Sequence, residues 1–103
     1  MKKLTIQPQD RQQILIELYK QYLLSEITLG QLLSYLRKNV LGLSQEQYAN
    51  LVGISRRTLT DIEQDKGKLT QSVLDKVFKP LGLKAGLVPT HEHIVSKIIK
   101  PNE

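Results

Sequence analysis

Serine and threonine residues followed three positions later by glutamine mark helix starts twice in this chain. Thr28 with Gln31 and Ser44 with Gln47 have the spacing of a capping box. In this motif each of the two side chains accepts a hydrogen bond from a backbone N–H that the first turn leaves free. Apolar residues recur behind both pairs at intervals of three and four, the period of a helix with one buried face. Starts placed so close together allow only short helices. The chain is therefore predicted to fold as a bundle of short α-helices.

Similar signals divide the chain into five predicted helices. Pro8 can open the first, because a proline in the first turn needs no N–H partner, and glycines can close the second and third in the left-handed conformation. Residues 65–67 are predicted to form a turn between the fourth and fifth. The predicted helices span Pro8 to Leu24, Thr28 to Gly42, Ser44 to Gly53, Ser55 to Gln64 and Thr70 to Leu81.

The sequence after the fifth predicted helix allows more than one structure. Residues 83–88 are predicted either as a short edge strand that pairs with its copy in a second subunit or as an extended tail lying on the core. Residues 90–103 place isoleucine and valine among charges, which fits an amphipathic turn or a mobile terminus. The predicted domains are a helical extension over 1–27, a main helical domain over 28–83 and a strand or tail over 84–103.

Composition narrows the protein class. The chain has 103 residues, no cysteine and a formal net charge of +5, with a pI near 9.6. This length suits one domain that needs no disulfide or metal, and the lack of cysteine suits the reducing cytoplasm. No stretch approaches the roughly 20 apolar residues of a membrane span, so neither export nor membrane insertion is expected. The positive charge favours an anionic partner such as nucleic acid, although a basic solvated surface would give the same value.

No catalytic, cofactor or metal site is predicted. The sequence has no glycine-rich phosphate loop, nucleophile elbow or pair of acids, so an enzyme is not expected. His91 and His93 flank Glu92 without the spacing of a zinc helix, and they are interpreted as tail residues. The four tyrosines fall at helical spacing and are expected to pack in or beside the core.

The segment from Ser44 to Glu63 has the form of a helix-turn-helix. Gly53 lets two short helices cross steeply, and Ala49 is small enough for their close approach. Ile54, with Leu59 and Ile62, is predicted to hold the second helix against the first. The residues left outside are Ser55, Arg56, Arg57, Thr58, Thr60 and Asp61.

The stretch LSQEQYANLVGISRRTLTDIEQDKGKLT resembles the lambda repressor-like, XRE-type helix-turn-helix proteins, with each anchor of the L-S-Q-x-x-x-A-x-x-x-G-[IV]-S pattern filled. The resemblance implies an all-α, five-helix DNA-binding domain. In this chain an extra N-terminal helix precedes that domain, and either the short C-terminal strand or the extended tail follows it. It implies that Gln45 contacts phosphate and supports the recognition helix. It also implies that Glu63 pairs with a basic residue of the preceding helix, Arg37 or Lys38. By this resemblance, the side chains expected to face bases are Arg56, Arg57, Thr60 and Asp61. Thr58 is expected to contact either the DNA backbone or a base.

The chemistry of these side chains agrees with such roles. Arg56 and Arg57 can each donate two parallel hydrogen bonds to guanine O6 and N7. Ser55, as N-cap, and the amides behind it can bind phosphate at the positive end of a helix. Lys66 and Lys68, in the loop that follows, are expected to add phosphate contacts.

The expected partners follow from this architecture. Two recognition helices reach successive major grooves only from a dimer, so we expect a homodimer on palindromic double-stranded operator DNA, located on the cytoplasmic nucleoid. The segment LGLKAGLV after the fifth helix resembles HipB-type antitoxins, which pair with HipA-type kinase toxins and repress their own operon. The alternatives are a solitary phage-like or host regulator, and an interaction module that inhibits a partner without reading DNA.

Overall fold

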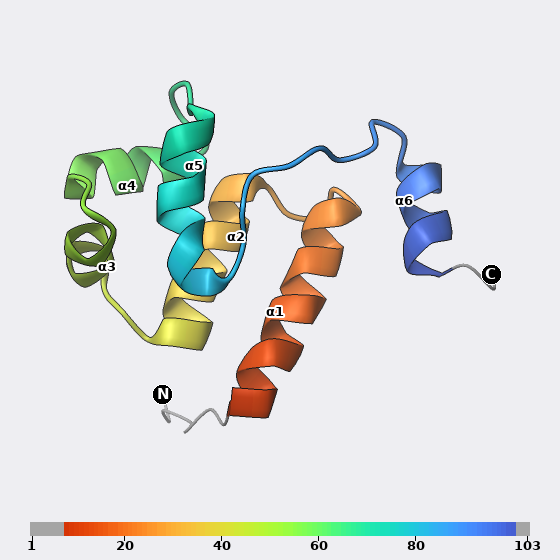
Figure 1. Ribbon diagram of the computed structural model, residues 1–103, viewed down its shortest axis with the longest axis horizontal. Helices are drawn as coiled ribbons and strands as arrows, with labels where there is room; N and C mark the ends of the chain where they lie inside the picture. Colours follow the sequence, from red (N-terminus) through yellow and green to blue (C-terminus); the bar gives the residue numbers. More distant parts are fainter. Residues whose placement is uncertain (1–7, 101–103) are drawn as a thin grey trace.

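The computed structural model describes residues 8–100, and over this range the protein is all-helical, as predicted (Figure 1). The first seven residues of the predicted N-terminal extension and the last three of the predicted tail lie outside the described residues. The α-helices are α1 (Pro8–Leu23), α2 (Leu29–Leu36), α3 (Gln45–Val52), α4 (Arg56–Glu63), α5 (Gln71–Phe78) and α6 (Glu92–Ile99). A π-helical turn, η1 (Arg37–Leu41), extends α2, and a 3₁₀ turn, η2 (Lys79–Leu81), extends α5.

The predicted helix starts and stops are confirmed. Thr28 and Gln31 form a reciprocal capping box at α2, with hydrogen bonds of 3.1 and 2.9 Å, and Ser44 with Gln47 forms the same pair at α3. A single residue in the left-handed conformation, Gly42, ends η1. These local bonds satisfy the free backbone groups at the helix ends, which explains why the short helices begin and end where the sequence indicates.

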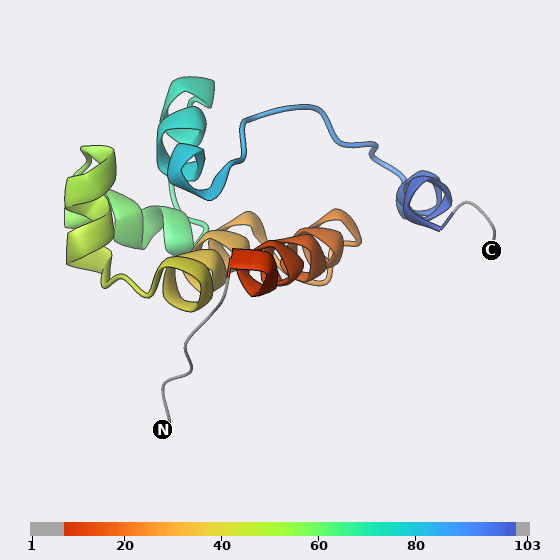
Figure 2. The same ribbon diagram turned by 60° about the horizontal axis from the view of Figure 1, so that its bottom comes forward.

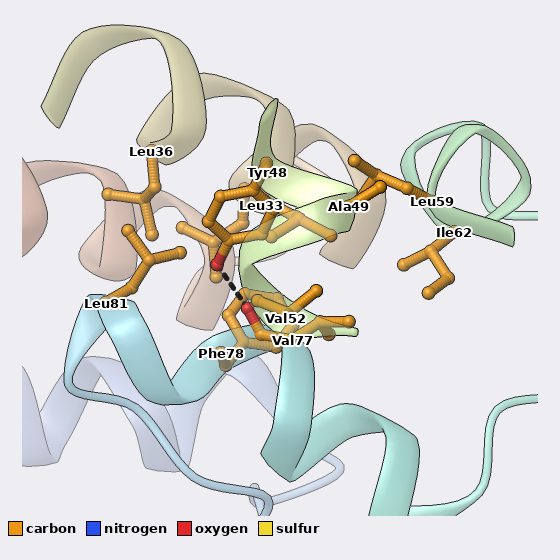
Figure 3. Close-up of a cluster of buried hydrophobic side chains, with 11 residues drawn as sticks. Leu33, Leu36, Tyr48, Ala49, Val52, Leu59, Ile62, Val77, Phe78 and Leu81 are labelled. Carbon is orange, nitrogen blue, oxygen red and sulfur yellow. Dashed lines mark hydrogen bonds between the residues drawn. The ribbon is translucent and has the colours of Figure 1, made fainter. Parts of the chain in front are cut away.

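The core lies between α2 and the three helices that follow it, with α1 packed along α2 from outside (Figure 3). Tyr48 is fully buried there, and its hydroxyl donates a hydrogen bond to the Val77 carbonyl. Burial raises the pKa of Tyr48 to about 12, and the nearby charge of Glu63 adds to the rise. The largest buried side chains are Leu32, Leu33, Leu36, Tyr48, Leu59, Ile62 and Val77. Tyr48 in the core and Tyr22 packed against it agree with the expectation for the tyrosines, whereas Tyr19 and Tyr35 are exposed.

Of the two alternatives predicted for residues 83–88, the structure shows the extended segment and not the strand. Among the described residues there is no strand, and the segment is an extended connection between α5 and α6. One reason is that the single chain offers no second strand as partner. Another is that the Ala85 N–H, which a ladder would use, donates instead to Asp75 Oδ1 on α5 at 2.7 Å.

Residues 92–99 form a helix, α6, where the sequence left a turn or a mobile end open. Figure 2 shows α6 at one end of the molecule, set apart from α3, α4 and α5. It packs against α1, and Val95 is its buried contact residue, whereas Ile94 and Ile98 stay exposed. His91 stands at its N-cap without a side-chain capping bond. This missing cap explains why the sequence carried no clear start signal for α6.

None of the helices within residues 8–100 is both long enough and apolar enough to cross a bilayer.

Candidate nucleic-acid interface

A tight turn joins α3 to α4 and fixes the angle between them. Gly53 adopts the left-handed conformation, at φ 77° and ψ 37°, and its N–H donates to the Ala49 carbonyl at 2.9 Å. The Ile54 N–H donates to the same carbonyl at 3.0 Å, so helix α3 ends here and does not continue. Ala49 is buried where the helices cross. The predicted helix-turn-helix geometry is therefore present.

The exposed face of α4 begins with two arginines. Arg56 and Arg57 are both exposed in its first turn, and neither side chain has a hydrogen bond or ion pair to any part of the described chain. Leu59 and Ile62 on the opposite face are buried against the core. The helix thus presents two unpaired guanidinium groups to solvent, close to its positive end.

Ser55 and Thr58 are tied together at the start of α4. The Ser55 hydroxyl accepts from the Thr58 N–H at 3.0 Å and donates to Thr58 Oγ1 at 2.8 Å. The Ser55 hydroxyl is therefore occupied by capping. The Thr58 hydroxyl keeps its own hydrogen, so it can donate outward to a phosphate or a base.

Four polar side chains link α4 to α3 and to the end of α2. The carboxylate of Glu63 receives Arg37 Nε at 2.6 Å and Arg37 Nη2 at 2.9 Å, a bidentate ion pair in which both side chains are about 95% buried. Gln45 Nε2 donates to Glu63 at 3.1 Å, and the Thr60 hydroxyl lies 3.2 Å from Gln45 Oε1. Arg37 also donates to the Leu43 carbonyl at 2.8 Å. The predicted partner of Glu63 is thus Arg37, and Lys38 makes no such bond.

This network sets the charge state of Glu63. Burial alone would raise the pKa of Glu63, but hydrogen bonds from Arg37 and Gln45, with the charges of Arg37 and Lys38, hold that pKa below its ordinary value. Glu63 is therefore an anion at neutral pH, buried and fully paired. Its role is to hold α4 against α2 and α3, as the resemblance implies.

The other residues expected at the interface lie around α4. Gln45 is half-buried and committed to Glu63, so its side chain supports α4 from within. The Thr60 hydroxyl also lies 2.9 Å from the Arg56 carbonyl of its own helix, and its approach to Gln45 places it on the side of α4 that faces α3. Asp61 is half-buried. Lys66 and Lys68 are exposed in the loop between α4 and α5.

The contact between Asp65, after the end of α4, and the first turn of α2 at Gly30 was not predicted from the sequence. Asp65 accepts hydrogen bonds from Thr28 and Gly30, at the start of α2. No local signal identifies this contact, because Thr28 and Asp65 are 37 positions apart. Gly30 carries a weak signal, since a glycine inside a helical pattern costs stability and usually has a packing reason.

The histidines lie far from this interface in the chain. The His91 and His93 rings lie side by side, with their centroids 5.5 Å apart and their planes tilted by 36°. Within residues 8–100, no group of three or more potential metal ligands gathers.

Comparison with known proteins places the chain in a family. A family model described as helix-turn-helix matches residues 33–87, more than half of the chain, from within α2 to the connection after α5. Comparison with curated proteins and with solved structures gives no match. Proteins of the matched family are DNA-binding regulators and typically have no enzymatic activity. The chain belongs to the XRE-type helix-turn-helix family of DNA-binding regulators.

Proposed function

We propose that the protein is a sequence-specific transcriptional repressor that reads operator DNA with α4. The observation that carries this proposal is the pair of exposed, unpartnered arginines, Arg56 and Arg57, in the first turn of a helix whose other face is anchored in the core. Exposed arginines of this kind can reach base edges in the major groove. A surface that only contacts solvent has no requirement for two arginines at the start of a rigidly anchored helix.

The proposed contacts divide into base reading and phosphate binding. Arg56 and Arg57 read guanine by paired hydrogen bonds, and Asp61 can accept from the amino group of cytosine. Phosphates lie at the N-terminal ends of α3 and α4, where free N–H groups and the helix dipole favour anions. Lys66 and Lys68 add phosphate contacts that hold the register.

We propose that two copies bind a palindromic operator together. The supporting feature is the connection after α5, where Leu87 is fully exposed and Val88 is 39% exposed. Beside this segment, a cavity of about 150 Å³ opens between it and helices α1, α2 and α5. A second copy that covered this face would bury these side chains and set two α4 helices on one side of the duplex.

As a finer role, we propose the antitoxin of a HipA-type kinase toxin, repressing its own operon. The support is the resemblance of residues 81–88 to HipB-type antitoxins. In this arrangement residues 28–83 read DNA, and the extension over 1–27 and the tail over 84–103 offer protein-binding surfaces. A kinase encoded by the neighbouring gene should then co-purify with the protein, and a solitary regulator would purify without one.

The test is a gel shift on the DNA upstream of the protein's own gene. We expect the wild type to shift this fragment, and Arg56→Ala or Arg57→Ala to bind it about 1 to 3 kcal/mol more weakly, because each removes a bidentate base contact. Arg11→Ala is the matched control, since it removes one exposed arginine from α1. Both α4 variants should keep the melting temperature of the wild type.

Two results would contradict the proposal. One is equal operator affinity for the α4 variants and the wild type. The other is an equal loss in Arg11→Ala, which would mean that net charge alone accounts for binding. An interaction module that never reads DNA would shift neither the upstream fragment nor any other duplex.

A further inference from the structure

The end of α4 is fastened to the start of α2 by one side chain. Asp65 lies two residues after the last residue of α4, and its two carboxylate oxygens bind different groups. The Thr28 hydroxyl donates to Asp65 Oδ2 at 2.5 Å, and the Gly30 N–H donates to Asp65 Oδ1 at 2.9 Å. Both donors belong to the first turn of α2 or its cap. A carboxylate in this position also complements the positive end of the α2 dipole.

The backbone of Asp65 is held in an unusual conformation. Its φ is +58°, in the left-handed region that residues other than glycine rarely occupy. Its N–H donates to the Ile62 carbonyl at 3.0 Å, and the next N–H, of Lys66, donates to the Asp61 carbonyl at 2.8 Å. A conformation of this kind persists where surrounding contacts fix it. The two bonds to α2 are such contacts.

Gly30 shows how closely the two helices approach. A Cβ atom added to Gly30 would lie 2.5 Å from the Glu63 carbonyl oxygen and 2.6 Å from that of Ile62. Backbone therefore meets backbone where α2 begins and α4 ends. The negative C-terminal end of α4 faces the positive N-terminal end of α2, which is the favourable arrangement of two helix dipoles.

We propose that Asp65, with Thr28 and the Gly30 N–H, forms a clamp that sets the tilt of α4 and thereby positions Arg56 and Arg57. This inference rests on the proposed DNA reading by α4. The helix has eight residues and is about 12 Å long, so a tilt of about 10° at its clamped end moves its first turn by about 2 Å. Paired hydrogen bonds to a base edge do not survive such a shift. Asp65 is thus a positioning residue that touches no DNA.

The test compares two variants that lose the same charge. Asp65→Asn keeps the clamp, because the side-chain oxygen accepts from Gly30 and the amide group donates to Thr28 Oγ1. Asp65→Gly loses both bonds and adopts the left-handed conformation without steric cost, so its fold is retained. A difference between these variants does not come from charge, since both lose the same carboxylate and its effect on nearby DNA phosphates.

The first readout is amide hydrogen exchange in the free protein. We expect the Gly30 amide and the last-turn amides of α4 to exchange at least about tenfold faster in Asp65→Gly than in Asp65→Asn, because a hydrogen bond to a charged or polar oxygen protects them. Equal exchange in both variants would overturn the clamp, whatever the protein binds.

The second readout is binding to the operator and to a random duplex of equal length. We expect Asp65→Gly to bind the operator about tenfold more weakly than Asp65→Asn, with equal affinities for the random duplex, because tilt affects base contacts and not overall charge. Equal operator affinity in the two variants would overturn the positioning role. If the wild type binds neither duplex while the two Asp65 variants still differ in exchange, the proposed function is refuted and the clamp remains a feature of the fold.

A second pair of variants tests the other side of the clamp. Thr28→Ser keeps the hydroxyl, and Thr28→Val removes it at nearly constant shape. We expect Thr28→Ser to resemble the wild type in both readouts. Thr28→Val should resemble Asp65→Gly in operator binding and in the exchange of the last-turn amides of α4, but it should be less stable, because the same hydroxyl also caps α2 at the Gln31 N–H. Adding Thr28→Val to Asp65→Gly should weaken operator binding no further. Additive losses in the double variant would show that the two side chains do not act together.

Discussion

Glu63 is the residue on which three helices depend, and its ionisation gives a measurable signature. The pKa of Glu63 is lowered in the folded protein, so its stabilising contribution is complete above the ordinary value of 4.5 and is lost as pH falls through the folded pKa. We expect Glu63→Gln to lose about 3 to 5 kcal/mol at neutral pH, because it leaves Arg37 buried without an anion. The difference in unfolding free energy between Glu63→Gln and the wild type should shrink below about pH 4.5, and urea unfolding measured at a series of pH values checks this.

The matched control is Glu26→Gln. Glu26 is exposed after α1, and its side chain has no hydrogen bond or ion pair within the described residues. This variant should remain near the wild type at neutral pH. If the difference in unfolding free energy between Glu63→Gln and the wild type stays constant down to acidic pH, Glu63 is not the anion that pairs with Arg37.

At the scale of elements, the approach of α2 to α4 makes Gly30 irreplaceable. Alanine at this position would place its Cβ against two carbonyl oxygens of α4, neither of which can move alone. We expect Gly30→Ala to cost about 1 to 3 kcal/mol of stability, although alanine favours helices, since overpacking outweighs propensity here. The measurement is chemical unfolding followed by circular dichroism.

Gly86→Ala is the control for the Gly30 substitution. Gly86 lies in the connection after α5, and a Cβ added to it meets no atom within 4 Å. Its free energy of unfolding should stay within about 0.5 kcal/mol of the wild type. Equal stability of the two alanine variants would argue against the close packing of α2 on α4.

The sequence allowed the elements to be predicted where their signals are local. Thr28, Ser44 and Gly53 each act on backbone within a few residues, so capping and turn chemistry revealed them. The partnership of Arg37 with Glu63 came from the family resemblance, which left Lys38 open. Asp65 could not be identified as a cap for α2, because its partners are distant in the chain and only the packed structure brings them together.

Two further elements, η1 and α6, could not be predicted from local sequence signals. The π-helical turn η1 carries Arg37 toward both Glu63 and the Leu43 carbonyl, and apolar periodicity gives no hint of this extra residue in the turn. Helix α6 has the apolar spacing of a helix but no capping side chain, so its pattern fitted a tail equally well. Residues 83–88 have strand-like composition, and only a pairing partner could turn them into a strand.

At the scale of the whole molecule, the exposed connection after α5 bears on oligomeric state. If two copies cover it, a charge at Leu87 should separate them, because burying each leucine contributes about 1.5 to 3 kcal/mol and a two-fold interface counts it twice. We expect wild type to sediment as a dimer and Leu87→Lys as a monomer, with weaker operator binding. Analytical ultracentrifugation is the measurement.

Leu51→Lys serves as the comparison for Leu87→Lys. Leu51 is also exposed, at 59%, but it lies on α3, away from the proposed dimer face. This variant should sediment with the wild type. A monomeric wild type, or a dimeric Leu87→Lys, would exclude this face as the contact between copies.

The buried ion pair between Arg37 and Glu63 affects how the protein unfolds. A form in which α4 has detached while α2 and α3 stay packed keeps the guanidinium of Arg37 in a largely apolar place with no counter-charge, which is costly. Partly assembled forms of helices α2, α3 and α4 are therefore disfavoured, and we expect these helices to unfold together. A cell would then hold this regulator either folded or unfolded, so its abundance, and not a graded loosening of α4, would set how much of its target DNA is occupied.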